Sequence, residues 1–484
     1  MTIIRLLISL ALPTLAGYAL LSFILRRNRP GPLASLALSF GLGLGILTHW
    51  MLLLDIVKVK YSVGTIGSPL VIFSLLVFLS ILFTTKKKKD LNTSPVDEQA
   101  AAKDASLPET HPAKNLMRVL YVLLGLYILY YLFYIFWRGL NIPINTWDAL
   151  SSVAFKAKVF FYERSLFHLK DTPAHPSYPI LIPLAQAWVA LNLGAWSDQL
   201  VKIVFPVTTL CLVIIHNYFL TSYTNKRWAL LGVTMLISSN LLIEHSTIAY
   251  RDLFLAFYAY TSVVLLLVWL DKKDDGFLIL ASLYAGFATF IKLEGLPYLL
   301  IYTALLLVIL FIKKAESLKR NVIRFLKFTV PSFSICLFFN LYKNFGGFPV
   351  YRRKSYVDFT WDSLSRIPII LKKFWGDLFL SGNWNIVWFI LVLSLVINLA
   401  RIKKSLEVRL LLTVLIMFFG FYFSASLFTT EFIWISSEKS ITTLSRLILH
   451  FFPLAPLLIV LLNYPEESRL KTSSLKPQKQ TRNR

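Results

Sequence analysis

Long apolar segments alternate with short polar ones along nearly the whole chain. Many of these segments contain about 20 residues, the length of a helix that crosses the hydrocarbon core of a bilayer. The pattern predicts roughly thirteen membrane-spanning helices, in the ranges 4–25, 31–54, 64–84, 117–140, 198–220, 228–244, 252–270, 276–291, 295–312, 322–341, 385–400, 409–428 and 442–462. The fold class that we expect is therefore all-α, a polytopic bundle of transmembrane helices.

One further apolar segment, residues 178–195, is predicted not to cross the membrane. If it crossed, every later loop would change sides, and the basic groups of those loops would face outside. With 178–195 left out, the cytoplasm receives the run Lys86–Lys89 and all the later basic groups, as the positive-inside rule requires: Lys226 and Arg227, Lys272 and Lys273, 313–320, 401–404 and the basic tail. We expect an interfacial helix on the outer membrane face, or a segment that enters the membrane and returns.

Composition and charge agree with a membrane protein. Of the 484 residues, 56% are hydrophobic and 15% charged, which is more apolar than a soluble domain. The formal net charge of +25 fits basic cytoplasmic loops that meet anionic lipid headgroups. A nucleic-acid-binding protein is disfavoured, because no polar region is long enough to form a basic domain. Cys211 and Cys336 both lie in apolar segments, which favours buried thiols over a disulfide.

The predicted topology divides the chain into segments. The first apolar stretch is longer than the core of a secretory signal, and Arg26, Arg27 and Arg29 follow it, so we expect a retained anchor whose start faces outward and not a cleaved signal. The segments are an N-terminal three-span block (1–85), a polar cytoplasmic loop (86–116), a central module (117–341) with the outer loop 141–197, a basic outer loop (342–384), C-terminal spans (385–462) and a basic cytoplasmic tail (463–484).

Acidic residues near the membrane fall on one side of this topology. A charge next to hydrocarbon is costly, so acids that remain there are candidates for function. Five acids stand out among those predicted to face outward: Asp148, Asp252, Glu294, Asp358 and Glu438.

Five short motifs accompany these acids in a fixed order. They are NTWDAL with Asp148, HPSYPILIPLAQAW (His175–Trp188), IAYRDLFLAFYAY with Asp252, IKLEGLPYLL with Lys292 and Glu294, and SRLILHFFPLAPLLIV with Arg446. Across residues 117–462 this ordered set resembles the GT-C superfamily of membrane glycosyltransferases, which includes the protein O-mannosyltransferases and the aminoarabinose transferase of lipid A.

The resemblance implies a GT-C-like fold, in which 117–341 is the catalytic module, and an enzyme of the cell inner or plasma membrane whose active site faces outside. Its donor would be a sugar on a polyprenyl phosphate or diphosphate, and its acceptor a lipid, a glycan or a protein. The acceptor would attack the anomeric carbon with inversion, which needs one general base and a cation near the leaving phosphate. A single carboxylate suffices, unlike the pair in a glycosidase.

Each candidate residue has a functional and a structural interpretation. Asp148 would be the base, with Trp147 beside it at an interfacial sugar site, or it would only cap the helix that follows. Asp252 would orient the acceptor or assist a metal, or it would pair with the adjacent Arg251. Lys292 and Glu294 would join the site or merely stabilise a short turn.

The remaining candidates would bind substrate: His175, Tyr178, Arg352, Arg353 and Arg446. Arg352 and Arg353 would clamp an anionic lipid head or form a solvated basic surface. Arg446, with His450 one helical turn later, is the strongest candidate to meet the phosphate.

A metal site is only weakly indicated. His168, Asp171 and His175 share one loop but match no zinc signature. Asp148 and Asp252 together could hold Mg²⁺ or Mn²⁺ against a diphosphate, whereas a monophosphate donor would need no metal.

Other classes of protein remain open. A transporter or flippase of lipid-linked sugars would show internal repeats and charges at mid-membrane, which this sequence lacks. An O-antigen ligase or polymerase would use outer arginines and a histidine in one large loop, and the loop 342–384 has arginines but no histidine. A non-catalytic scaffold would be insensitive to a change of Asp148.

Overall fold

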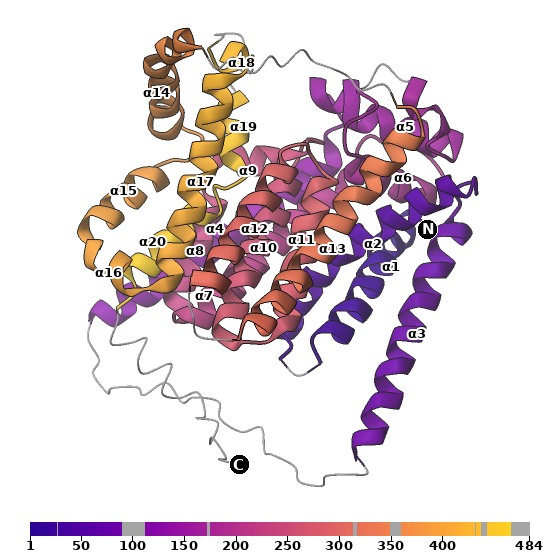
Figure 1. Ribbon diagram of the computed structural model, residues 1–484, viewed down its shortest axis with the longest axis horizontal. Coiled ribbons are helices and arrows are strands. Elements are labelled where there is room, and N and C mark those ends of the chain that lie inside the picture. Colours follow the sequence, from indigo (N-terminus) through magenta and orange to yellow (C-terminus); the bar gives the residue numbers. More distant parts are fainter. Residues whose placement is uncertain are drawn as a thin grey trace.

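The structure is a computed structural model that describes residues 1–26, 28–89, 112–171, 175–312, 317–348, 360–430, 432–436 and 443–465. All the secondary-structure elements of this part of the chain are helices. Figure 1 shows them gathered into one bundle, with α14 (Ile367–Trp375) and α18 (Phe432–Ser436) standing at one end.

Eight helices are long and apolar enough to cross a membrane, or nine if the bent pair α19–α20 is one span, within the described residues. The chain is therefore a helical membrane protein, as the sequence predicts. Six of the eight are α1 (Thr2–Ile24), α2 (Pro32–Ile56), α3 (Val63–Lys89), α4 (Pro112–Asn141), α10 (Asp252–Lys272) and α13 (Leu318–Phe345). The others are α17 (Leu406–Phe428) and α7 (Val204–Tyr223), which is preceded by the short helix η3 (Leu200–Ile203).

Several of the thirteen predicted spans are shorter or broken. The predicted span 228–244 divides into α8 (Lys226–Ile237) and α9 (Asn240–His245), because the Ser239 hydroxyl accepts a hydrogen bond from Leu242 N and caps a new helix. The predicted span 442–462 divides into α19 (Thr443–Leu449) and α20 (Leu454–Asn463), bent by 52° next to Pro453. Three more apolar helices fall below the length of a span: α11 (Asp275–Thr289), α12 (Gly295–Ile312) and α15 (Val387–Ile397).

The segment predicted as an interfacial helix is instead an internal one. Helix α6 (Leu181–Leu193) has 13 residues, and its residues from Leu181 to Asn192 are all buried. It packs against α1, α2 and α5 (Ala154–Glu163), and the Trp188 indole donates to the Ser9 carbonyl at 2.8 Å. An interfacial helix would keep one face against lipid or water, so the interfacial alternative was wrong, while a segment that enters the membrane and returns stays a prediction. At a length of about 20 Å, α6 is also too short to span a bilayer.

Small residues and tyrosines hold the inner helices together. Helices α1 and α2 approach so closely that a Cβ on Gly17 would lie 1.9 Å from the Ser39 carbonyl oxygen. Tyr258 on α10 and Tyr284 on α11 each donate to a carbonyl oxygen of α2, both at 2.6 Å. By contrast, only 22% of the residues in the most apolar stretch of α3 and 6% of those in α4 are buried inside the protein, which fits a lipid-facing position for both helices.

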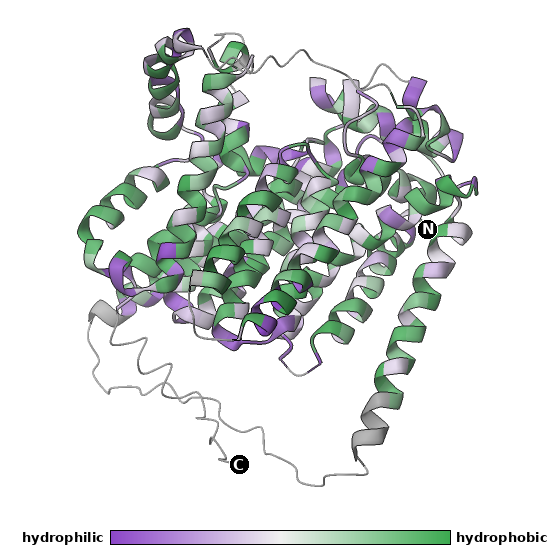
Figure 2. Ribbon diagram, viewed as in Figure 1, coloured by the Kyte–Doolittle hydropathy of each residue, from purple (hydrophilic) through white to green (hydrophobic). Residues whose placement is uncertain are grey.

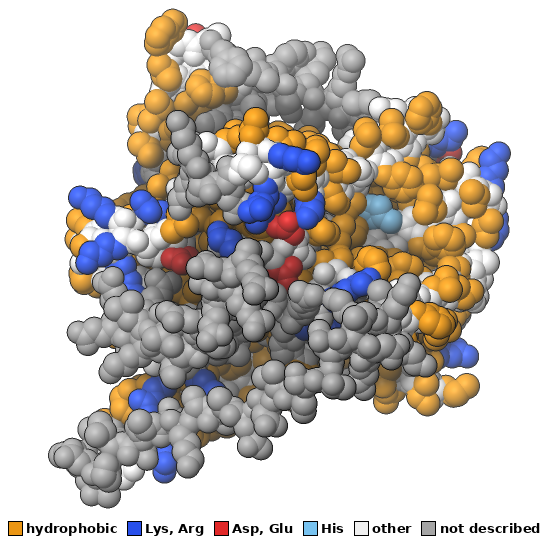
Figure 3. Space-filling view, turned by 60° about the horizontal axis from the view of Figure 1, so that its bottom comes forward, with side chains coloured by type: hydrophobic (Ala, Val, Ile, Leu, Met, Phe, Trp, Pro, Cys, Tyr) orange, Lys and Arg blue, Asp and Glu red, His pale blue; other side chains and the backbone are white. Residues whose placement is uncertain are grey.

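The two ends of the bundle differ in what they carry. Figure 2 shows hydrophilic residues mainly at the two ends and hydrophobic residues between them. We call the end with α5 and α14 the site end. The opposite end, the basic end, carries α16 (Leu399–Lys404) and the close of α10, and Figure 3 shows lysine and arginine side chains on it. The short helices η1 (Ala149–Val153), η2 (Phe167–Asp171), η4 (Trp361–Arg366) and η5 (Gly376–Leu380) complete the described elements.

Candidate functional site

Asp252, the first residue of α10, is the centre of a buried charged cluster. Its side chain is fully buried, with an exposed fraction of 0%. Lys292 Nζ and His450 Nε2 each lie 2.9 Å from Asp252 Oδ1, and Arg446 Nε lies 3.1 Å from Oδ2. A carboxylate this deep is stabilised only when cations and hydrogen-bond donors replace water around it, as they do here.

Arg446 on α19 joins this centre to a second acid. Its Nη1 donates to Asp148 Oδ2 at 2.6 Å, while its Nη2 lies 3.1 Å from Asp252 Oδ2. The guanidinium also lies over the ring of Tyr250, 4.6 Å from the ring centroid. One arginine therefore balances both predicted catalytic acids, which come from distant parts of the chain.

The turn between α11 and α12 completes the cluster. Lys292 Nζ lies 3.0 Å from Glu294 Oε1 in addition to its bond with Asp252. Burial alone would lower the pKa of Lys292, but Asp252 and Glu294 outweigh burial and raise that pKa. Burial would likewise raise the pKa of Glu294, but Lys292 and His450 outweigh it and lower that pKa. The pair thus does more than stabilise a turn, because Lys292 ties the turn to Asp252. We call Asp148, Asp252, Lys292, Glu294, Arg446 and His450 the Asp252 cluster.

A line of hydrogen bonds leads from the cluster into the bundle. His450 Nδ1 lies 2.6 Å from the Tyr422 hydroxyl, which lies 2.7 Å from the Tyr298 hydroxyl. His245 adds a second imidazole 3.7 Å from Asp252 Oδ2. Sequence reasoning missed these two tyrosines, His245 and Tyr250. Tyr250 stands two residues before Asp252 and His245 follows the predicted span 228–244, whereas Tyr298 and Tyr422 lie in apolar runs that give no signal.

Asp148 does not cap the helix that follows it. It occupies the N-terminal position of η1, yet its side chain makes no capping hydrogen bond. The carboxylate turns to Arg446 and keeps 41% of its surface exposed. The capping interpretation is therefore wrong. Trp147 beside it is 78% exposed.

Two buried cations lie next to the Asp252 cluster without a carboxylate of their own. Arg251 Nη2 donates to Ser152 Oγ at 2.9 Å, so the suggested pairing of Arg251 with Asp252 is not what the side chain does. Lys156 Nζ on α5 donates to the His175 carbonyl at 2.7 Å. Within the described residues neither forms an ion pair, and the buried Arg251 Nε has no hydrogen-bond partner. We call Lys156 and Arg251 the cation pair.

Tyr178 links these two cations. Arg251 lies 5.6 Å and Lys156 Nζ 6.0 Å from the centroid of its ring. The His175 ring stacks on the same tyrosine at 5.0 Å. Burial, followed by the charges of Arg251 and Lys343, holds the pKa of Lys156 well below its usual range. The structure thus brings His175 and Tyr178 close to the cluster through Arg251.

The remaining predicted residues lie outside the described part of the chain or have partners other than the Asp252 cluster. Arg352 and Arg353 lie outside the described residues, as do Asp358 and Glu438. His168 faces Glu163 and Asp171 at 3.7 and 3.9 Å, while His175 lies against Tyr178 instead.

The residues do not fit a resident Mg²⁺ or Mn²⁺ between the two aspartates. Asp148 and Asp252 share Arg446, and Asp252 is already surrounded by donors. In the described part of the chain, no group of three or more His, Cys, Asp or Glu side chains is arranged so that it could hold a metal ion.

No family model matches this chain, and comparison with curated proteins and with solved structures found no match.

Proposed function

We propose that the protein is an inverting glycosyltransferase of the GT-C type. It would move a sugar from a polyprenyl phosphate or diphosphate to an acceptor at the outer membrane face. The observation that carries the proposal is the convergence of the ordered motifs: Asp148, Asp252, Lys292, Glu294 and Arg446 lie far apart in sequence but in one cluster. The cluster lies at one end of the bundle. A transporter would instead need charged residues near the middle of the membrane.

Asp148 is the group best suited to accept a proton. It is partly exposed, whereas Asp252 is fully buried. Arg446 holds one carboxylate oxygen, and the other, Oδ1, has no hydrogen-bond partner in the described part of the chain. An acceptor hydroxyl or amine could therefore donate to Oδ1 without displacing a protein group.

Asp252 acts in this scheme by positioning Arg446. Because Arg446 contacts both acids, Asp252 and its partners fix the guanidinium that orients Asp148. Arg446 is then occupied by carboxylates, so it is poorly placed to receive the leaving phosphate. This modifies the role that the sequence suggested for it.

The cation pair is the better candidate to receive the leaving phosphate. Lys156 and Arg251 are buried, adjacent to the Asp252 cluster and unpaired with any acid in the described part of the chain. Burying cations without an anion is costly, and a bound phosphate would remove that cost. Tyr178, which lies against both, would contact the same group.

The reaction would be a single displacement. The acceptor oxygen or nitrogen forms a bond to the anomeric carbon as the bond from that carbon to the phosphate oxygen breaks. Asp148 takes the acceptor proton, and the phosphate leaves with the bonding electron pair beside Lys156 and Arg251. One base and one cationic site suffice, and the configuration at the anomeric carbon inverts.

The test is a mass analysis of lipid-linked sugars in cells with the gene, without it, and with Asp148→Asn as the sole copy. We expect one polyprenyl-linked sugar to accumulate both without the gene and in the variant, with the variant protein present at normal levels. Asp275→Asn, at the opposite end of the bundle, serves as the control and should behave like the wild type. No change in any lipid-linked sugar on loss of the gene would contradict the proposal.

A further inference from the structure

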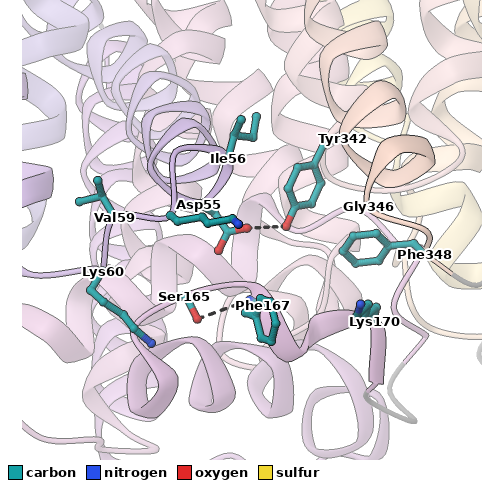
Figure 4. A pocket seen from close by; sticks show the side chains of 11 residues that line it. Asp55, Ile56, Val59, Lys60, Ser165, Phe167, Lys170, Tyr342, Gly346 and Phe348 are labelled. Carbon is teal, nitrogen blue, oxygen red and sulfur yellow. Dashed lines mark hydrogen bonds between the residues drawn. The ribbon is translucent and has the colours of Figure 1, made fainter.

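A hollow lies at the site end, and none of the residues that line it belongs to the Asp252 cluster. It has a volume of about 310 Å³ and is lined from three segments: the end of α2, η2 and the end of α13. Figure 4 shows these segments around it, with Lys60 and Lys170 on either side of Phe167 in that view.

A single acid fixes the frame of this hollow. Asp55 Oδ1 accepts a hydrogen bond from the Leu166 backbone N–H at 2.6 Å. Asp55 Oδ2 accepts one from the Tyr342 hydroxyl at 2.7 Å, as Figure 4 shows. These bonds join α2, the start of the η2 segment and α13. Both carboxylate oxygens of Asp55 are therefore already hydrogen-bonded, and among the residues that the structure describes it is the only acid that lines the hollow.

The lining is otherwise basic and apolar. Three lysines line it: Lys58, Lys60 and Lys170. Lys60 Nζ donates to the Glu163 carbonyl at 3.0 Å, and Lys170 Nζ lies 5.8 Å from the centroid of the Phe167 ring. None of the three forms an ion pair in the described part of the chain. Three cations against one acid give the hollow a net positive charge, so it selects anions.

Lys58 is held in place by the end of α2. Its N–H bonds to Asp55 O at 3.0 Å and the next N–H, of Val59, bonds to Leu54 O at 2.8 Å. These two bonds form a Schellman motif, in which a residue in the left-handed conformation, usually glycine, ends a helix. Here Lys58 is that residue, with a φ of 58°. The cap is rigid, so the root of this side chain is fixed at the rim of the hollow.

The position of the hollow relative to the membrane indicates the kind of anion that it binds. Span α2 ends at Ile56, span α3 begins at Val63, and α13 ends at Phe345, so the hollow lies where these spans leave the membrane. Apolar side chains of Ile56, Val59, Phe167 and Phe348 share the lining with the lysines. A ligand with both a phosphate and an acyl chain satisfies both kinds of lining, whereas free phosphate satisfies only one.

We propose that this hollow binds the headgroup of an anionic phospholipid. Basic pockets beside membrane helices favour such headgroups, at a gain of several-fold in affinity for each lysine. The proposal does not depend on the glycosyltransferase proposal, because it uses none of the residues of that site. A lipid bound here would tie α2, η2 and α13 together at the membrane surface.

The experiment measures retention of phosphatidylglycerol by the purified protein, using native mass spectrometry against a background of phosphatidylcholine. The variant is Lys58→Gln, Lys60→Gln and Lys170→Gln together. The matched control is Lys158→Gln, Lys372→Gln and Lys373→Gln, which removes three lysines of the site end that do not line the hollow. We expect the first variant to lose at least about tenfold in phosphatidylglycerol affinity and the control to keep it.

Two results would overturn the proposal. One is equal loss, or no loss, of phosphatidylglycerol binding in the two variants. The other is binding of inorganic phosphate to the hollow as tightly as the lipid, which would make the site one for a free anion. The unfolding temperature of each variant in phosphatidylcholine alone shows whether it has folded, and Lys170→Gln by itself provides a milder variant.

Discussion

Two acids at opposite ends of the bundle form similar ion pairs, but the pairs differ in what they indicate about function. Asp252 begins α10 at the site end, and Asp275 begins α11 at the basic end. Asp275 meets Lys327 Nζ at 2.8 Å, Arg324 Nε at 3.1 Å and the Trp269 indole at 3.2 Å. Each acid thus has two cations, and a count of contacts would not separate them.

The difference lies in what remains after the charges are paired. At the basic end, Asp275 is 27% exposed and joins three helices, and its pairing leaves nothing directed at a ligand. At the site end, the fully buried Asp252 holds Arg446 against the partly exposed Asp148, and the cation pair lies beside them. Function is therefore indicated by the unpaired groups and not by the salt bridges themselves.

The largest effect on stability is expected from Asp252→Asn. The carboxylate of Asp252 is fully buried, and its loss leaves the half-buried Lys292 and Arg446 with one carboxylate partner each, which should cost about 3–5 kcal/mol. Thermal unfolding of the detergent-solubilised protein measures it. A loss below about 1 kcal/mol would mean that the cluster is more hydrated than its burial indicates.

The pH dependence of stability should arise at the site end. Burial raises the pKa of Asp377 in η5 to about 6 from a usual value of 3.8. The folded state then keeps a proton that the unfolded state has released, so stability is lost as pH rises from about 4 to 6 and stays lost above. The shift corresponds to about 3 kcal/mol.

The measurement for Asp377 compares unfolding of the wild type and Asp377→Asn between pH 4 and 7. The difference in unfolding free energy between the wild type and Asp377→Asn should change between pH 4 and 6 and be constant above pH 6. Parallel curves would show that Asp377, which accepts a hydrogen bond from the Ser445 hydroxyl, titrates normally.

The cation pair should show stability and function in opposition. Lys156→Met replaces a buried cation by an apolar side chain of similar size, so the unfolding free energy should rise by about 1 kcal/mol or more. The same change removes a ligand of the donor phosphate, so the KM for the donor should rise at least about tenfold. A less stable variant with an unchanged KM would instead assign Lys156 a structural role.

The smallest effect is expected from Asp275→Asn. Its pairs are partly exposed, so the loss should be about 1 kcal/mol or less, with sugar transfer unchanged. Unfolding and transfer assays on the same preparation measure both. A loss of transfer here would remove the distinction between the two ends.

Much of the bundle could be predicted from the sequence. Apolar length and charge asymmetry report directly on the bilayer, so the helix positions and the all-helical membrane class follow from them. The breaks did not follow, because the Ser239 cap and the bend at Pro453 interrupt runs whose hydropathy is continuous. The burial of α6 was hidden for a similar reason, since an apolar helix looks the same whether lipid or protein surrounds it.

The site was partly predictable as well. Acids retained near hydrocarbon are rare, which singled out Asp148, Asp252 and Glu294 and brought Arg446 with them. Their pairing could not be predicted, because it depends on how α10, α19 and the turn before α12 meet. For the same reason the sequence did not indicate that Arg446 contacts both acids or that Lys156 is buried beside Tyr178.

The most direct test of the account is sugar transfer by the purified protein in liposomes, comparing Asp148→Asn with Asp275→Asn. A lipid extract that contains the accumulated polyprenyl-linked sugar supplies the donor. We predict that Asp148→Asn unfolds only a few degrees below the wild type, because its pair with Arg446 is partly exposed, but transfers sugar at least about 100-fold more slowly, while Asp275→Asn keeps its activity. Transfer at the wild-type rate by Asp148→Asn would contradict the account.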